Sequence, residues 1–286
     1  MGFLDGLKKF GLGNIEEEDL YEEPKKAQVK KEEVKKEVVP LNEETLLFDK
    51  KYTCPICDKQ FESKTVRSGK VRTKGVDIDL RPDYDEIDQI KYDIITCPKC
   101  GYSALARYYG NLTKFQCDEI RSKISANYKE QKFSGTTYSY EEAHMRYELA
   151  IATAMVKKAK NSEKAYLCLK MAWLLRGETQ RLDPNAEGNE EKKKSNDEQE
   201  KELLKKALDG FVIARQSETP PIAGMDELTL DYLMGALGLE TGDFDVANKM
   251  VGSIITSRTA NSRLKDKAKD LKDKIKEEME KTKATK

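Results

Sequence analysis

The chain is poor in histidine and in long apolar stretches. It has 286 residues and a single histidine, His144, which excludes histidine-rich metal sites and zinc proteases of the HExxH type. The longest apolar run, residues 150–156, is interrupted by a threonine and is far shorter than the roughly 20 residues of a membrane helix. The N-terminal residues lack the apolar core of a secretory signal. We therefore expect a cytoplasmic protein.

An excess of charge of one sign is also absent. The 52 Lys and Arg residues balance the 52 Asp and Glu residues, so the chain as a whole gives no reason to expect nucleic acid or an anionic membrane. Charged residues reach 36%, which is high for one uniform globule and predicts compact domains joined by solvated segments. A P-loop and a GxGxxG motif are both missing, so a nucleotide-driven mechanism has no signature here.

Composition divides the chain into five segments. We predict a short amphipathic helix at 1–12, a charged flexible linker at 13–48, a zinc-ribbon-like module at 49–111, a tetratricopeptide-like helical domain at 112–260, and a charged capping helix and tail at 261–286. The predicted fold class is therefore mainly α, with a small β-rich zinc module ahead of helical repeats.

The stretch at residues 2–12 has one small apolar face. Phe3, Leu4 and Leu7 share that face, while Lys8 and Lys9 lie elsewhere. Peripheral contact with the inner face of the membrane, docking on a partner helix, and a disordered tip all remain open for it.

Four cysteines have the spacing of a metal site. Cys54 and Cys57 form one CxxC pair, and Cys97 and Cys100 form a second within CPKCG. In such turns two thiolates converge and the following glycine takes a positive φ; Asp58 replaces that glycine in the first turn, and Asp tolerates this conformation better than most residues. Two turns predict a tetrahedral four-thiolate site for Zn²⁺, with iron as the second choice. Four thiolates leave no open position, so we expect a structural ion.

The two pairs are farther apart than in most four-cysteine zinc sites, which predicts an inserted hairpin between them. A redox role for a CxxC pair is the alternative, but it normally needs a βαβ context that is missing here. Cys117 and Cys168 fall in helical patterns and are interpreted as small packed residues. A Cys117–His144 dyad is conceivable, although no pattern brings the two together. We expect no enzyme activity.

From about residue 112 the pattern is helical. We predict helices near 112–131, 141–159, 162–176, 198–217, 227–240, 244–257 and 261–280, with a long exposed loop at 178–197 and a helix C-cap at Gly177. Residues 226–257 resemble a degenerate tetratricopeptide repeat, with Gly235 and Ala247 at a close helix crossing, and 141–176 resemble another. Such repeats commonly hold a protein partner in a concave groove; the alternative is a groove filled by the chain itself.

A basic segment precedes an acidic one. Residues 66–72 predict a strand–turn–strand hairpin with Ser68 and Gly69 at its bend. The basic residues in and around it could contact nucleic acid, and they are Lys64, Arg67, Lys70, Arg72 and Lys74. Tyr84 or Tyr108 could stack on bases there.

The acidic segment contains Asp77, Asp79, Asp83, Asp85, Glu86 and Asp88. Paired carboxylates can hold Mg²⁺ or act as acid and base. Arg81 lies among them, so we favour a structural Asp–Arg network.

Several strings together resemble one family: CPIC, VRSGKVR, VDIDLRPDYDEI, YDIITCPKCGYSA and PIAGMDELTLDYLMGAL followed by GDFDVA. It is the uncharacterised bacterial family called "domain of unknown function 2225", and the resemblance covers about residues 50–280. It implies a zinc-ribbon-like start and a repeat-like helical end, and it implies no activity. Our leading prediction is a non-enzymatic, zinc-binding adaptor that binds a protein; the alternative is RNA or DNA binding through the basic hairpin.

Overall fold

The computed structural model of the chain describes residues 42–84, 86–133 and 135–284, which belong to one compact unit. The helix predicted at 1–12 and most of the predicted linker lie outside these residues. Helices dominate the described part, and small antiparallel sheets accompany them. None of the described helices combines the length and the apolar character that crossing a membrane requires.

The strands form three hairpins, each a two-stranded antiparallel sheet, within the described residues. The pairs are β1 (Leu47–Thr53) with β2 (Gln60–Val66), β3 (Thr73–Val76) with β4 (Pro82–Tyr84), and β5 (Ile94–Thr96) with β6 (Ser103–Leu105). The basic hairpin predicted around residues 66–72 is wrong. β2 pairs along its length with β1 up to Val66, a 3-10 turn follows at Ser68–Lys70, and β3 pairs with β4 instead.

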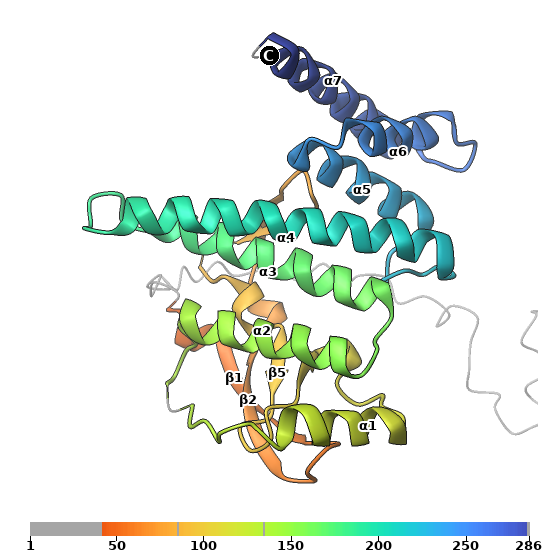
Figure 1. Cartoon of the computed structure of the whole chain (residues 1–286). Helices are drawn as coiled ribbons and strands as arrows, with labels where there is room; N and C mark the ends of the chain where they lie inside the picture. The colour runs from red at the N-terminus through yellow and green to blue at the C-terminus, as the bar shows by residue number, and fades with distance from the viewer. Residues whose placement is uncertain (1–41, 85, 134, 285–286) are drawn as a thin grey trace, which may run out of the picture. The chain divides into compact units, whose positions relative to one another are not determined.

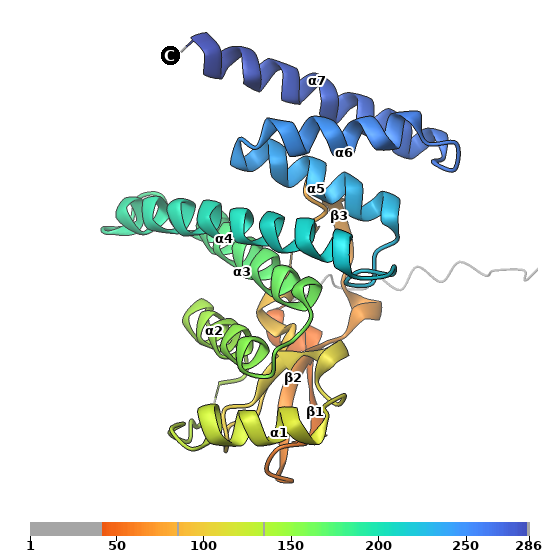
Figure 2. The same cartoon turned by 45° about the vertical axis from the view of Figure 1, so that its right-hand side comes forward.

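The helices follow one another as a stack of neighbours (Figure 1). They are α1 (Lys114–Ile120), extended by a π-helical turn (Arg121–Ser125), α2 (Tyr140–Val156), α3 (Asn161–Arg181), α4 (Asn189–Ser217), α5 (Glu227–Thr241), α6 (Phe244–Thr256) and α7 (Ser262–Ala284). The turned view shows β1, β2 and α1 at the end of the stack opposite α7 (Figure 2). The β5–β6 hairpin packs against α2, so the cysteine-bearing part and the helices share a core.

The predicted starts of α2 and α6 lie within one residue of the observed ones. Ser139 and Glu142 form a capping box at the start of α2, and Asp243 caps α6. The exposed loop predicted at 178–197 is wrong, because α3 continues to Arg181 and α4 begins at Asn189. The first turns of α4 are almost wholly exposed, so they carry no apolar periodicity, and good helix formers alone mark them.

Small residues let the helices approach each other closely. A Cβ added at Gly210 of α4 would lie 2.8 Å from the Ala165 side chain of α3. One added at Gly235 of α5 would lie 2.9 Å from Val251 of α6, and Ala247 of α6 contacts the same helix at Gly238. The close crossing of α5 and α6 is therefore where the pattern places it. The assignments to tetratricopeptide repeats and to a zinc ribbon stay predictions.

Candidate metal centre

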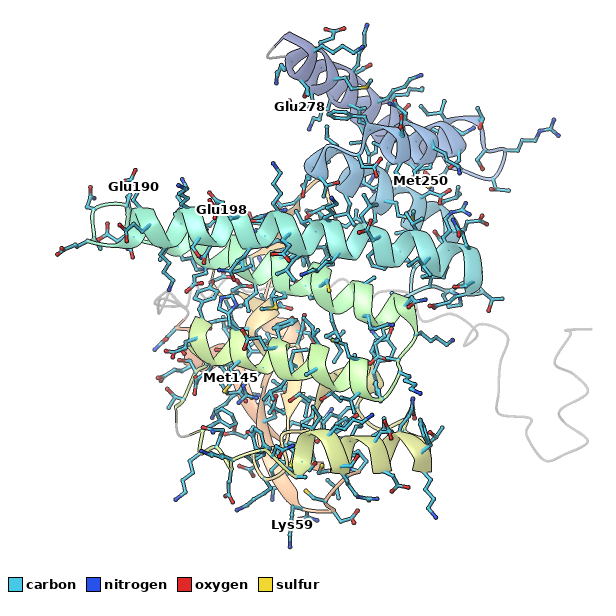
Figure 3. The ribbon with its side chains drawn as sticks, in the orientation of Figure 1. Lys59, Met145, Glu190, Glu198, Met250 and Glu278 are labelled. Atoms are coloured by element: carbon cyan, nitrogen blue, oxygen red, sulfur yellow. The ribbon has the colours of Figure 1, made fainter. Side chains whose placement is uncertain are left out.

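The first cysteine turn lies between β1 and β2, at the tip of their hairpin, where Figure 3 labels Lys59. The backbone N–H of Cys54 donates to the carbonyl of Lys59 at 3.0 Å, and that of Asp58 donates to the carbonyl of Cys54 at 2.9 Å. The N–H of Ile56 points at the Cys54 sulfur, 3.4 Å away. Asp58 takes a φ of 58°, as predicted for the residue that replaces glycine.

The second turn, between β5 and β6, repeats this hydrogen-bond pattern. The N–H of Cys97 donates to the carbonyl of Tyr102 at 2.9 Å, and that of Gly101 donates to the carbonyl of Cys97 at 3.0 Å. Gly101 has a φ of 73°, and a Cβ there would lie 2.5 Å from the ring of Tyr128. Both the backbone conformation and the lack of space therefore require glycine at this position.

The two turns bring all four predicted sulfur atoms together. Their Sγ atoms lie within 4.8 Å of one another. The Cys54 and Cys100 sulfurs are 3.5 Å apart, and those of Cys57 and Cys97 are 3.7 Å apart. Sulfurs about 2.3 Å from one tetrahedral ion are separated by about 3.8 Å, so the group fits a four-thiolate metal site. These distances are too long for a disulfide.

Hydrogen bonds between these thiols link the pKa of each one to the protonation of the others. Hydrogen bonds from Cys100 and Cys97 lower the pKa of Cys54, and the hydrogen bond to Cys54 in turn raises the pKa of Cys100. The thiols thus share protons, which a metal ion would displace on binding. Soft or borderline ions suit such a donor set, whereas Mg²⁺ and Ca²⁺ prefer oxygen.

The cysteine centre is largely shielded from solvent. Cys54, Cys97 and Cys100 are buried, and Cys57 is half-buried. Residues from both hairpins and from α1 surround them, and the guanidinium of Arg121, in the π-helical turn, donates to the carbonyl of Ile56 at 3.0 Å. Helical residues after the second turn therefore hold the first turn in place.

The predicted nucleic-acid residues are spread over several elements. The Lys64 ammonium lies 2.9 Å from a carboxylate oxygen of Asp49 on the neighbouring strand. Arg67 donates to the carbonyl of Leu47 at 3.0 Å and lies over the ring of Phe48. Lys64 and Arg67 are therefore engaged with other residues of the chain.

The other three basic residues, Lys70, Arg72 and Lys74, are exposed. Tyr84 lies opposite Thr73 in the β3–β4 register. Thr73 is the residue that follows Arg72 in the sequence. The second predicted stacking residue, Tyr108, instead contacts Arg107 and Lys157.

The acidic segment forms a network with two arginines. Arg81 lies 3.2 Å from Asp77, as predicted, and Arg176 of α3 lies 3.0 Å from Asp79. The indole N–H of Trp173 donates to the buried carboxylate of Asp79 at 2.7 Å. In the part of the chain that the structure describes, only the four cysteines form a group of three or more ligands close enough to share an ion.

Arg176 is the residue of this network that the sequence did not reveal. Its guanidinium also contacts Glu200 of α4 at 2.7 Å and Glu240 of α5 at 3.0 Å. Burial and the Asp79 carboxylate raise the pKa of Glu240 to about 7, against the opposing effect of Arg176. Arg176 and these partners come from four separate segments of the chain, so no local pattern could have predicted the network.

The remaining candidates do not assemble into a catalytic group. His144 bonds to Glu178 of α3 at 3.0 Å, and no hydrogen bond joins it to Cys117, both residues being described. Cys117 lies half-buried on α1 beside the cysteine centre. Cys168 is half-buried on α3, and burial raises the pKa of its thiol. A buried thiol of raised pKa is a poor nucleophile.

Comparison with known proteins gives a family and no activity. Residues 47–275 match a family model described as an uncharacterised protein conserved in bacteria (DUF2225). Neither a curated protein nor a solved structure matches the chain.

Proposed function

Because the chain belongs to the DUF2225 family of uncharacterised bacterial proteins, we propose a function from its geometry: a non-enzymatic adaptor, held together by a structural Zn²⁺ ion, that binds another protein through its helices. The convergence of four buried sulfurs supports the ion. An apolar cavity among α4, α5 and α6 supports the protein-binding role. The proposal places the chain in the cytoplasm, where cysteines stay reduced and available to a metal.

Zn²⁺ is the proposed ion because it favours tetrahedral thiolate sites. Cys54, Cys57, Cys97 and Cys100 would hold it, and its binding energy would join two hairpins that are too small to be stable alone. Metal analysis of protein purified without chelator should give about one zinc per chain. Cys97→Ser should lose it, whereas Cys168→Ser, which changes a cysteine outside the centre, should keep it. Equal zinc in both variants would exclude the site.

The cavity is the observation that carries the adaptor role. It has a volume of about 190 Å³ and is lined by Val212 of α4, Met234 of α5, and Val246 and Met250 of α6, the last labelled in Figure 3. Arg215, Gln216, Lys249 and Ser253 form its polar part. Apolar grooves between helices are a common way to bind the apolar face of a partner's helix, whose anchoring side chains enter such a cavity.

Site-specific photo-crosslinking in the native host tests this role. A photoreactive residue at Gln216 or at Lys249 should crosslink the same protein from both positions. The same residue at Lys267 of α7, which is exposed and does not line the cavity, is the control. Adding Val246→Lys should abolish the crosslink without changing the circular dichroism spectrum. Equal crosslinking from Lys267, or none from the cavity, would contradict the proposal.

Nucleic-acid binding is the second candidate, favoured by the exposed Lys70 and Arg72. Binding of RNA or DNA through this surface should weaken steeply with salt, and K70A/R72A should reduce that salt dependence. Binding that is unaffected by these changes would exclude this surface.

A further inference from the structure

Aromatic rings surround the cysteine centre. The ring of Tyr109 lies 4.8 Å from that of Tyr102, 5.8 Å from that of Tyr52 and 6.3 Å from that of Phe61, measured between centroids. Tyr109 is 5% exposed and belongs to the same buried cluster as the cysteines. Contacts with three other aromatic rings therefore fix its position and leave its hydroxyl group little freedom.

The hydroxyl of Tyr109 is unusual because it is buried and has no hydrogen-bond partner among the described residues. By contrast, the hydroxyl of Tyr102 donates to the backbone carbonyl of Tyr109 at 2.7 Å. Buried hydroxyl groups nearly always have a partner, so an orphaned one calls for an explanation.

Cys54 and Cys97, when ionised to thiolates, are the charged groups that act on this hydroxyl. Burial, and then the negative charge of Cys54 and Cys97, raise the pKa of Tyr109 well above its ordinary value. A tyrosine hydroxyl is protonated at neutral pH and can donate a hydrogen bond. Four thiolates around a divalent ion carry a net negative charge in this buried place, so their sulfurs are good acceptors.

We propose that the Tyr109 hydroxyl donates a hydrogen bond to the Cys54 thiolate of the metal-loaded centre, which makes Tyr109 a positioning residue for the metal. This inference rests on the proposed metal centre. The backbone N–H of Ile56 already points at the same sulfur, so Cys54 would accept from two donors. Donors to a ligand fix its orientation and spread its charge, and their loss typically weakens metal binding 10- to 100-fold.

Tyr109→Phe tests the inference because it removes the hydroxyl and keeps the ring. In the full chain, competition with a chelator should show an affinity for Zn²⁺ about tenfold lower than in the original protein. Loaded with Co²⁺, the variant should show a shifted sulfur-to-cobalt charge-transfer band. The rise in Tm on adding Zn²⁺ should also be smaller. With chelator present, the Tm of the variant should equal or exceed that of the original protein, because an unpartnered group has been removed.

Tyr52→Phe is the matched control, since it makes the same change in a ring of the same cluster. It should leave the affinity and the Co²⁺ spectrum unchanged. If Tyr109→Phe binds both ions as the original protein does, or if both variants lose affinity equally with unchanged spectra, the inference is wrong. If the original protein itself binds no ion, the proposed metal centre fails first, so the two failures are distinguishable.

Discussion

A single glycine of α3 shows how much depends on one missing carbon atom. Gly177 lies against Asp88, and a Cβ there would be 2.1 Å from the Asp88 carboxylate and 3.0 Å from the Arg81 guanidinium. That carboxylate accepts hydrogen bonds from the N–H of Ile90 at 3.1 Å and from the hydroxyl of Tyr140 at 2.9 Å. Any side chain at position 177 would displace it from these donors.

Gly177→Ala is therefore expected to lower the free energy of unfolding by about 1–3 kcal/mol, measured by urea denaturation. Gly252→Ala is the control, because Gly252 also lies inside a helix but a Cβ there meets no atom within 4 Å. Alanine is the better helix former, so this second change should stabilise the protein by up to about 1 kcal/mol. Losses of equal size in the two variants would contradict the close contact with Asp88.

We predicted from the sequence that Gly177 is a helix C-cap. That prediction is wrong, because Gly177 lies inside α3 and glycine occurs in helices for two different reasons. It marks helix ends, where φ is positive, and it marks close contacts inside helices. Gly242 is of the first kind, with a φ of 78° at the end of α5. Gly177 is of the second kind, and its partner Asp88 is far away in the sequence. Only the tertiary structure separates the two cases.

The two cysteine turns both need a residue with a positive φ, but only the second also lacks space for a side chain. Gly101→Ala should strain the second turn and push against the Tyr128 ring, so we expect a lower affinity for Zn²⁺ and a lower Tm. Asp58→Gly should keep full zinc content and change the free energy of unfolding by at most about 1 kcal/mol, because glycine accepts the positive φ of this exposed position. Zinc content and thermal unfolding check both variants. The reverse order of effects would contradict the geometry of the turns.

Elements defined by local chemistry were predictable, and those defined by distant partners were not. The cysteine spacing identified all four residues of the centre and the positive φ of Asp58, because a CxxC turn is local. The pairing of β3 with β4 was missed, since strand pairing depends on residues that the chain brings together only on folding. The start of α4 was missed because its exposed turns need no apolar face.

For the whole molecule, the position of the cysteine centre determines what metal removal should do. Ile94 and Leu105 of the β5–β6 hairpin pack in the same core as Tyr147 of α2, whereas α6 and α7 share a separate core around Val251 and Leu271. Chelation should therefore speed hydrogen exchange at least tenfold in residues 52–61 and 95–109, in part in α2, and leave α6 and α7 protected. Adding Zn²⁺ back should restore protection. Loss of protection to the same extent along the whole chain, or no loss anywhere, would contradict this order of protection.

The Arg176 network links the segment around Asp79 to α3, α4 and α5, so its titration should affect the stability of the whole unit. The pKa of Glu240, about 7 in the folded chain, lies above the 4.5 expected when it is unfolded. Between these values the folded state holds a proton that the unfolded state has lost. The contribution of Glu240 to stability therefore falls as pH rises from about 4.5 to 7 and is constant above that range.

Glu240→Gln removes this titration and keeps an oxygen that can accept from Arg176. Both proteins are compared loaded with Zn²⁺. As pH rises from 5.5 to 8, the free energy of unfolding of the variant should increase relative to that of the original protein. We expect a change on the order of 2 kcal/mol across that interval. Taking the difference cancels the pH dependence of the thiolates and the other carboxylates, which both proteins share. Glu277→Gln, at an exposed position of α7, should give a flat difference, and parallel profiles for Glu240→Gln would show that Glu240 is ionised throughout.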